Sequence, residues 1–453
     1  MRTILWFRRD LRIEDNALLA IEGEVLPLFI FDSTILESLP REDRRVGFII
    51  EAVSKLREVL RARGLDLLIF HGEPTEIFAV LKEEGFDEVW AAPDWDSYAR
   101  TRDAAVGAIL KLQWVNNNYL FTPAQLLKAD GTPYVVFKAY YTKAKALWTP
   151  ELGRTFTPAR QTLALLRHEI PHRIQSDAIA KAIGFAPQPH GVASIETLLE
   201  AFDIASYASM RDRIDEEVTS GLSVHLRFGT LGIRTLVAWM VAQKKRGIET
   251  EPFFRQLLFR EFYAYLLYHL PHVATRNFRY DVAGIPDERR YSAFCQGRTG
   301  VPLVDAGIHE LLETGRMHNR VRMVVASFFT KHLLLPWQWG EAFFARYLLD
   351  YDAASNILSW QWSASTGVDA QPYFRIFNPY TQARAYDPDA HYIKEWLPQL
   401  AHLPPKELHD EHFLLSHAIE DYPKPIVEHA KARMEALAQF GYDKSQQRRE
   451  DET

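Results

Sequence analysis

Short apolar runs alternate with amphipathic stretches over the first 120 residues, and this alternation limits the fold more than any other feature. The apolar runs have the length of buried strands and occupy residues 4–7, 25–32, 65–70 and 88–94. Helical spacing of apolar residues marks 48–63 and 75–84. Parallel strands need a long crossover between one strand and the next, and that crossover is usually a helix. The sequence therefore predicts a doubly wound parallel sheet with helices on both faces.

The remainder of the chain divides into a proline-rich segment and a long helical region. Seven prolines fall within residues 123–194, where no long period is visible, so we expect a linker with short helices laid over the surface. From 195 to 442 helical periodicity dominates, and no alternating strand pattern stands out. The predicted fold class is α/β plus all-α, with an α/β domain at 1–122, a helical domain at 195–442 and a polar tail at 443–453.

Size, charge and cysteine content restrict the class of protein. A chain of 453 residues can bury more than one core. Its formal net charge of -6 argues against a protein that coats nucleic acid nonspecifically, although a local basic groove is compatible with it. The single cysteine, Cys295, excludes a disulfide framework or a Cys-rich metal site, and no metal is expected. Without an apolar signal segment or a membrane-length apolar run, we expect a soluble cytoplasmic protein. We also expect a monomer.

The stretch 314–378 holds residue combinations that are unusual together. They are the run MHNRVRM at 317–323, the acidic pair Asp350 and Asp352, and Trp360 two residues before Trp362. If a helix covers 314–329, Arg320 and Arg322 lie about 200° apart around it, so they must bind different partners. A structural alternative is that both arginines form buried salt bridges that stabilise the fold. The two tryptophans point to opposite sides of their helix, although most tryptophans are simply core residues.

Two further segments contain residues that could bind a ligand. TSGLS at 219–223 precedes a helical segment, so its backbone N–H groups and the helix dipole can bind a phosphate. The alternative for this segment is an ordinary helix N-cap. In the predicted helix at 253–267, Gln256, Phe259, Arg260 and Tyr263 share one face. The plain interpretation of that face is the solvated side of an amphipathic helix.

Taken in this order, the motifs resemble those of the DNA photolyase/cryptochrome family. The resemblance runs from FRRDLR, which begins at residue 7, through WDSYARTRD at 95–103 to EWLPQL at 395–400. It is closest to the cyclobutane pyrimidine dimer photolyases, which are lyases that repair DNA under blue light. The resemblance implies that the first domain lies on the antenna side and that the helical domain binds FAD and UV-damaged DNA. Reduced FAD then passes an electron to a lesion flipped out of the duplex, and the electron returns.

The resemblance also implies a flavin site. Its members are Tyr207, Thr219, Ser220, Gly221, Leu222, Ser223, Phe253, Arg260, Arg322, Asp350, Asp352 and Asn356. Within this set, Arg322 is expected to pair with Asp350 beside the flavin ring, and Asn356 is expected to face flavin N5. By family position, Trp360 is the electron-relay residue nearest the flavin. Trp337 is the next relay residue, and it should open a helix after a proline.

A substrate and DNA site is implied in the same way. Its members are Arg211, Gln256, Phe259, Tyr263, Asn319, Arg320, Met323, Trp362 and Gln382. Gln256 and Phe259 depart from the family pattern, because enzymes that repair cyclobutane dimers generally carry Glu and Trp there. Met323 lies in the neighbourhood where enzymes for (6-4) photoproducts place a catalytic histidine. Its presence therefore favours repair of cyclobutane dimers.

Other departures keep alternative functions open. The usual third, surface-facing relay tryptophan is missing near Gly284, and Tyr280, Tyr291 or Trp339 are the candidate replacements. The alternatives are a cryptochrome-like blue-light photoreceptor and a (6-4) photoproduct photolyase. Some family members also bind an antenna chromophore, a folate or a deazaflavin, but the sequence identifies neither. It also does not indicate a preference for single- or double-stranded DNA.

Overall fold

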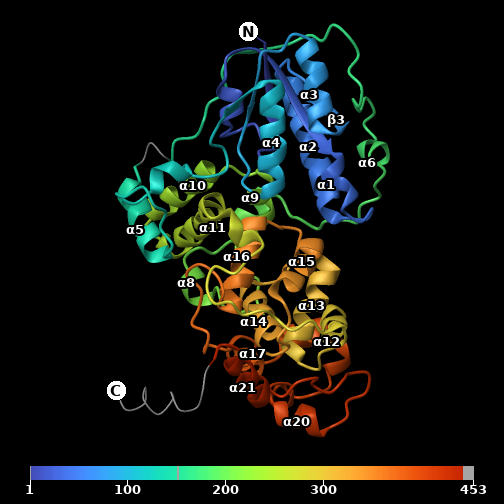
Figure 1. Ribbon diagram of the computed structural model, residues 1–453, viewed down its shortest axis with the longest axis vertical. Helices are drawn as coiled ribbons and strands as arrows, with labels where there is room; N and C mark the ends of the chain where they lie inside the picture. The colour runs from blue at the N-terminus through green and yellow to red at the C-terminus, as the bar shows by residue number, and fades with distance from the viewer. Residues whose placement is uncertain (1, 150–152, 442–453) are drawn as a thin grey trace. The chain divides into compact units, whose positions relative to one another are not determined.

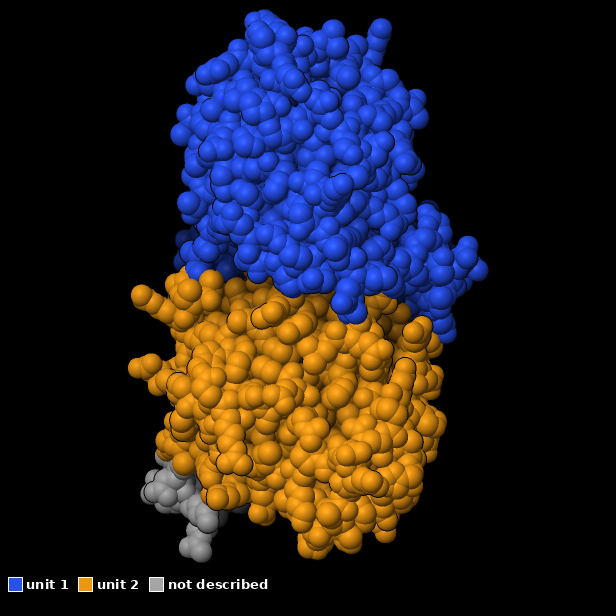
Figure 2. Space-filling model, turned by 90° about the vertical axis from the view of Figure 1, so that its right-hand side faces the viewer, with its two compact units in different colours: residues 1–205, 220–271 blue, residues 206–219, 272–453 orange. Residues whose placement is uncertain are grey.

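The computed structural model describes residues 2–149 and 153–441, and the chain divides into two compact units (Figure 2). Unit 1 comprises Met1–Ala205 and Ser220–Pro271, and unit 2 comprises Ser206–Thr219 and His272–Thr453. The domain boundaries expected at 122 and 194 stay predictions, because a compact unit need not follow the limits of a domain. The expected polar tail at 443–453 lies outside the described residues.

Unit 1 is built on a parallel sheet, as the sequence predicts. Its strands are β1 (Arg2–Phe7), β2 (Gly23–Asp32), β3 (Leu68–Gly72), β4 (Glu88–Ala91), β5 (Lys111–Trp114) and β6 (Gln161–Leu163). The order is β3-β2-β1-β4-β5, and β6 pairs with β2. Every pairing among these strands is parallel. Helices α2 (Arg44–Ala62), α3 (Pro74–Glu83) and α4 (Ser97–Ile109) form the crossovers and run beside the strands in Figure 1.

Apolar side chains from the sheet and its helices form the core of unit 1. Trp6 on β1 is 2% exposed, and its ring contacts Phe78 of α3 edge to face at 4.8 Å between centroids. Leu28 on β2 and Phe70 on β3 are also buried in this core. Burying each such side chain contributes about 1.5–3 kcal/mol, so continuous apolar strands favour this central position.

The proline-rich segment contributes more to the fold than the linker expected at 123–194. Its helix α5 (Phe137–Leu147) buries Phe137, Tyr140 and Ala144, and its strand β6 extends the sheet beside β2. Prolines at 133 and 158 lie outside these elements, so they delimit structure rather than prevent it. Strand β6 has three residues, and β5 has four partly exposed ones. Such short runs carry no clear period, which explains why both were missed.

The remaining helices of unit 1 are α1 (Ser33–Glu37), α6 (Ile179–Ala182), α7 (Ile195–Ala201), α9 (Ser223–Phe228), α10 (Ile233–Lys245) and α11 (Glu251–His269). Unit 2 contains α8 (Tyr207–Met210), α12 (Glu288–Cys295), α13 (Pro302–Thr314), α14 (Asn319–Lys331), α15 (Trp337–Tyr347), α16 (Ala353–Ala364), α17 (Pro379–Tyr386), α18 (His391–Trp396), α19 (Pro405–Leu408), α20 (Glu411–Ser416) and α21 (His429–Gln439). Short 3-10 helices are η1 (Ala17–Ala20), η2 (Pro123–Leu126), η4 (Pro271–Ala274) and η5 (Pro398–Leu400). No strand occurs in the described part of unit 2, as predicted.

Helix α14 is the central helix of unit 2 and packs against α13, α15, α16, α17 and α21. It begins at Asn319, not near 314 as the expected helix did. The reason is local: Gly315 ends α13 in the left-handed region at φ 72°, and His318 caps the new helix. Gly307 of α13 lies so close to Val321 that an added Cβ would overlap it, so the two helices can approach closely. None of the described helices is long and apolar enough to cross a membrane.

Candidate functional site

The expected site residues fall into two groups, and each group belongs to one compact unit. Unit 1 holds Ser220, Gly221, Leu222, Ser223, Phe253, Gln256, Phe259, Arg260 and Tyr263. Unit 2 holds Tyr207, Arg211, Thr219, Asn319, Arg320, Arg322, Met323, Trp337, Asp350, Asp352, Asn356, Trp360, Trp362 and Gln382.

Arg322 in α14 forms the expected ion pair with Asp350. Its Nη2 lies 3.1 Å from each carboxylate oxygen, and its Nε donates to the carbonyl oxygen of Met317 at 2.8 Å. The two charged side chains are 29% and 13% exposed, so solvent screens the pair only partly. Charge-assisted hydrogen bonds of this kind fix the turn before α16 against α14.

Arg320 binds a different partner, as the helix geometry predicts. Its Nη2 lies 2.9 Å from Asp212 Oδ2, and its guanidinium lies 4.4 Å from the centroid of the Tyr386 ring. Both arginines therefore form salt bridges, as in the structural alternative, but the two pairs are only partly buried. They stabilise unit 2 whatever else they bind.

His318, which the sequence analysis did not single out, caps the same helix. Its Nδ1 accepts a hydrogen bond from the Arg320 backbone N–H at 3.1 Å. Burial is the main cause that lowers the pKa of His318 to about 4, and the positive charges of Arg322 and Arg320 lower it further. The imidazole is therefore neutral near pH 7, as its role as an acceptor requires.

Asp352 and Asn356 belong to the start of α16. Asp352 is the N-cap, and its carboxylate accepts the Ser355 N–H at 3.0 Å, so it stabilises the junction between the preceding loop and α16. One turn later, Asn356 Nδ2 donates to the backbone carbonyl of Glu341 at 3.0 Å and to its Oε1 at 2.9 Å. This orientation uses both amide hydrogens, so Oδ1 is the atom that can accept from a ligand.

Glu341 of α15 is a second residue that sequence reasoning missed. It accepts from Asn356, and from the Tyr351 hydroxyl at 3.3 Å. Burial raises the pKa of Glu341, and these hydrogen bonds oppose the rise. No short motif links positions 341 and 356, because they lie on different helices. Only the packing of α15 on α16 brings the two side chains together.

Trp360 is 1% exposed, whereas Trp362 is only partly buried. The two indoles thus lie in different environments, as expected for positions on opposite sides of a helix. The Trp360 ring contacts Phe344 at 5.0 Å and Phe329 at 5.3 Å between centroids, both edge to face. Its Nε1 is buried and finds no hydrogen-bond partner among the described residues. Gly340 leaves room for this ring, because a Cβ there would overlap the indole.

Trp337 opens α15 after Pro336, as predicted, and its Nε1 donates to Asn277 Oδ1 at 2.8 Å. Gly284 has no space for the missing third tryptophan, because a Cβ there would overlap the Pro336 backbone. The close approach includes a hydrogen bond of 2.7 Å from the Ile285 N–H to the Leu334 carbonyl. A side chain at 284 is therefore incompatible with this arrangement of the chain.

The candidate replacements for that tryptophan separate into two clusters. Tyr291 contacts Trp339 at 5.1 Å and Phe329 at 6.2 Å between ring centroids. Phe329 in turn contacts Trp360, so Tyr291 and Trp339 are linked to it by aromatic contacts. Tyr280 instead contacts Tyr373 and Phe440, as part of another cluster.

The other expected residues of unit 2 surround the ends of its helices. Asn319 Nδ2 donates to Met323 Sδ at 3.5 Å, which confirms that these two residues share a face of α14. Burial raises the pKa of Tyr207, and Arg211, which ends α8, opposes the rise. Gln382 of α17 has a buried Oε1 with no partner among the described residues. It is an acceptor that a ligand can satisfy. Thr219 is exposed.

In unit 1, the segment Ser220 to Ser223 makes a tight turn into α9. Gly221 adopts φ 63°, and an added Cβ would come within 2.9 Å of Leu198. The Leu222 N–H donates to Ser220 Oγ at 3.4 Å. The N-cap of α9 is Leu222, so no hydroxyl side chain caps the first turn as the N-cap alternative requires. The amides of that turn are therefore suited to a phosphate.

Helix α11 presents the expected stripe, and all four residues on it are partly buried. Phe259 stacks on Phe137 of α5, with ring centroids 3.4 Å apart and planes 12° apart. The Arg255 guanidinium lies 5.1 Å from the Phe137 centroid. Gln256 and Tyr263 flank Phe259 on the stripe, whereas Phe253 is buried against Phe202. Phe259 thus has a packing partner of its own.

Arg260 uses two of its nitrogens to join parts of unit 1. Nη1 donates to the Asn118 carbonyl at 2.9 Å, and Nη2 donates to the Leu226 carbonyl at 3.1 Å. The guanidinium also lies 4.8 Å from the centroid of the Tyr119 ring. Because Leu226 belongs to α9, Arg260 fixes α9 against α11. This contact supports a role in positioning the phosphate segment.

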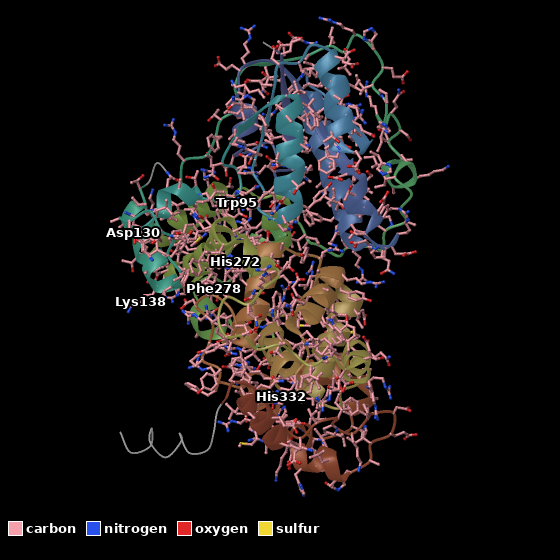
Figure 3. All side chains as sticks on the ribbon, in the orientation of Figure 1. Trp95, Asp130, Lys138, His272, Phe278 and His332 are labelled. Atoms are coloured by element: carbon pink, nitrogen blue, oxygen red, sulfur yellow. The ribbon has the colours of Figure 1, made fainter. Side chains whose placement is uncertain are left out.

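A cavity of about 620 Å³ lies in unit 1 at the carboxyl ends of β4 and β5. Trp95 (Figure 3), Trp114 and Tyr268 supply aromatic surface, and Arg100 and Asp103 supply charge. The Trp95 ring contacts Tyr268 edge to face at 5.6 Å. Ligands of open α/β sheets bind outside the carboxyl ends of the strands. The size and aromatic lining suit a planar organic ligand.

Two family profiles match this chain. The profile described as "DNA photolyase" matches residues 3–161, and the profile described as "FAD binding domain of DNA photolyase" matches residues 253–442. A deoxyribodipyrimidine photo-lyase of Halobacterium salinarum is 37% identical over 96% of this chain and 98% of its own. Cryptochromes also match.

Two solved structures extend the likeness to three dimensions. A class III photolyase of Agrobacterium tumefaciens is 30% identical, with a TM-score of 0.84 over 97% of each chain. A photolyase of Sulfolobus tokodaii, solved with two FAD molecules, is 28% identical, with a TM-score of 0.83 over 97% of this chain and 100% of its own. The fold expected from the sequence is confirmed.

Proposed function

The chain belongs to the DNA photolyase family, and from this premise we propose that it repairs cyclobutane pyrimidine dimers in DNA under light. The observation that carries the proposal is α16, which holds Asn356, Trp360 and Trp362 within two turns. One helix thus supplies an amide for the cofactor, a buried indole and a partly exposed indole. A purely structural helix does not need this combination.

FAD is the cofactor, and when bound it supplies light absorption and the electron that opens the dimer, with no net redox change. In unit 2, the Arg322–Asp350 pair and Asn356 bind its ring, and Asp352 and Tyr207 contribute to the same site. The orientation of Asn356 leaves Oδ1 as an acceptor, which suits a donor N5–H and so favours the reduced cofactor. In unit 1, the uncapped amides after Gly221 bind the pyrophosphate.

Damaged DNA is the substrate. Trp362, partly exposed, stacks on the flipped lesion. Gln382 Oε1, which no described residue contacts by a hydrogen bond, accepts one from the lesion or from the neighbouring strand. Arg211 and Arg320 contribute positive charge for phosphates. In unit 1, Gln256 and Phe259 bind the pyrimidines by an amide and an aromatic face. Gln256 cannot relay a proton as a carboxylic acid can, so its role is hydrogen bonding.

The cavity of unit 1 takes the second chromophore, a planar folate- or deazaflavin-like molecule, between Trp95 and Trp114. Aromatic walls stack on such a ring, and Arg100 provides charge for an acidic tail. The test is the absorption spectrum of the purified protein. Trp95→Ala with Trp114→Ala should remove any band other than that of FAD, and retention of that band would place the chromophore elsewhere.

Two oligonucleotides test which lesion the protein repairs. One contains a single thymine cyclobutane dimer, and the other contains a (6-4) photoproduct. Protein is reduced chemically beforehand, which bypasses the incomplete tryptophan relay, and repair is measured in light and in darkness. We expect light-dependent repair of the cyclobutane dimer only. Repair of the (6-4) product would overturn the lesion assignment, and repair of neither by protein with photoactive FAD would favour a cryptochrome-like photoreceptor. Cytoplasmic location and a monomeric state stay predictions.

A further inference from the structure

Lys331, the last residue of α14, is a buried lysine whose partners are not carboxylates. It is 1% exposed and precedes His332, which is labelled in Figure 3. Its Nζ donates to Ser365 Oγ at 2.7 Å and to the carbonyl oxygens of Arg375 at 2.9 Å and Tyr373 at 3.4 Å. Burial lowers the pKa of Lys331 to about 7, and nearby Arg375 lowers it further. Burying an amine costs free energy, so we expect its hydrogen bonds to have a structural role.

All three acceptors belong to the loop at 365–378, which directly follows α16 and therefore Trp362. Two buried glutamines make further links: Gln371 ties the loop to α16, and Gln361 ties α16 to the segment at 273–276. Gln361 Nε2 donates to the Val273 carbonyl at 2.6 Å, and Gln371 Nε2 donates to the Ser363 carbonyl at 3.0 Å. The loop is thus shaped by buried polar side chains rather than by secondary structure.

The loop is also joined to the segment at 276–280. The Thr366 carbonyl accepts the backbone N–H groups of Phe278 (Figure 3) at 2.9 Å and Arg279 at 2.8 Å. Arg276, whose side chain is exposed, accepts at its own carbonyl from Gln361 at 3.1 Å. The loop and this arginine-bearing segment therefore form one hydrogen-bonded surface within unit 2.

The groups that this surface presents to solvent suit nucleic acid. Phe374 is 54% exposed and Tyr280 is 51% exposed, and the side chain of Arg375, which follows Phe374 in the sequence, is exposed as well. The Tyr373 ring packs against both of them, at 6.1 Å from Tyr280 and 5.6 Å from Phe374 between centroids. Exposed aromatic rings with arginines stack on unpaired bases and bind the phosphate chain.

We propose that Lys331 is a positioning residue for DNA binding: it contacts neither DNA nor cofactor, and it holds the loop that presents Phe374 and Arg375. The proposal rests on the proposed function, because it assigns the loop to damaged DNA. A protonated lysine suits this task because its ammonium group can donate to three acceptors at once, whereas an apolar side chain would leave the buried carbonyl oxygens unsatisfied.

Lys331→Met tests this, because methionine fills a similar volume without a donor. We expect the Kd for dimer-containing DNA to rise about tenfold, from the loss of charged hydrogen bonds. Repair per absorbed photon in the saturated complex and the FAD spectrum should stay unchanged. Amide exchange should speed up at 365–378 and not elsewhere. The control is Ser327→Ala on the same helix. It removes a buried hydroxyl that has no hydrogen-bond partner in the described part of the chain, and it should change none of these quantities.

Ser365→Ala removes one of the three acceptors and gives a graded variant in case Lys331→Met does not fold. It should raise the Kd less and speed amide exchange over the same residues. Unchanged DNA affinity in a folded Lys331→Met, or in Ser365→Ala if that is the only folded variant, would overturn the proposal. So would faster exchange throughout unit 2, which indicates general destabilisation. If the unmodified protein neither binds nor repairs damaged DNA, the proposed function is wrong. In that case the amide exchange rates of Lys331→Met still show whether Lys331 holds the loop.

Discussion

At the scale of single residues, neighbouring side chains decide what each candidate can do. Asn356 is an example, because its contacts with Glu341 orient the amide and leave Oδ1 for a ligand. Arg260 shows the same effect, because two of its nitrogens bind backbone carbonyls of unit 1 and fix α9 against α11. The residue types were predictable from the motif, and their hydrogen-bonding state was not.

Asn356→Asp should speed the air oxidation of reduced FAD several-fold, as measured from the return of oxidised flavin absorbance. The substitution puts a second carboxyl within hydrogen-bond distance of Glu341, and two such carboxyls share a proton and retain negative charge at pH 7. That charge disfavours an anionic reduced cofactor. Ser355→Ala, on the same helix, is the control. An unchanged oxidation rate in Asn356→Asp would show that this position does not face the flavin.

Trp360→Phe should slow photoreduction of oxidised FAD at least about tenfold, while chemically reduced protein should still repair DNA. Phenylalanine keeps an aromatic ring in the pocket, and no hydrogen bond of the indole is lost because its N–H has no partner among the described residues. Transient absorption measures the photoreduction. Trp396→Phe is the matched control in unit 2, and equal photoreduction in the two variants would remove Trp360 from the relay.

At the scale of helices and strands, long periodic elements were predictable and short ones were not. The strands expected at 4–7 and 25–32 and the helix at 253–267 are present as β1, β2 and α11. Strand β6 was not predicted, because a strand of three residues becomes stable only by pairing with β2. The expected helix at 314–329 combined the end of α13 with α14, because apolar spacing continues across Gly315.

Helix α11 also contains an ionisable group on its buried side. Glu261 is 2% exposed and accepts the backbone N–H groups of Leu120 at 2.7 Å and Phe121 at 3.3 Å. Burial raises its pKa from 4.5 to about 7. A raised pKa means that the folded state holds the proton more tightly. This stabilisation is full below about pH 4.5 and is lost as the pH rises through 7.

Glu261→Gln should therefore flatten the decline of the unfolding midpoint between pH 5 and pH 8. Full loss of the proton-linked stabilisation amounts to about 3 kcal/mol for such a shift. At pH 5 the Glu261→Gln variant should be less stable than the unmodified protein, because the glutamine amide accepts hydrogen bonds from the two backbone N–H groups less well than the carboxyl group does. Thermal unfolding across the pH range measures both effects. The control is Glu200→Gln, because Glu200 is exposed. If the unfolding midpoint of Glu261→Gln declines with pH as much as that of the unmodified protein, Glu261 is not the group responsible.

At the scale of the whole molecule, the order of the motifs along the sequence identified the family, whereas the contacts within the candidate site depend on long-range packing. Trp337 and Asn277 are hydrogen-bonded although 60 residues apart, and Lys331 reaches a carbonyl 44 residues away. No local pattern predicts such partners, because they are set by how helices pack. The missing tryptophan at 284 likewise has a tertiary explanation in the close approach of Pro336. The motifs nonetheless sufficed to predict the fold class and the cofactor.

The central claim is cyclic, light-driven repair, and the most direct measurement counts dimers repaired per flavin. Protein is reduced once, the reductant is removed without air, and excess dimer-containing oligonucleotide is illuminated while flavin absorbance is followed. The account predicts many thymine dimers repaired for each FAD, with the flavin still reduced at the end and no repair in darkness. Repair that stops at one dimer per flavin with matching flavin oxidation, or no repair in light, would contradict it.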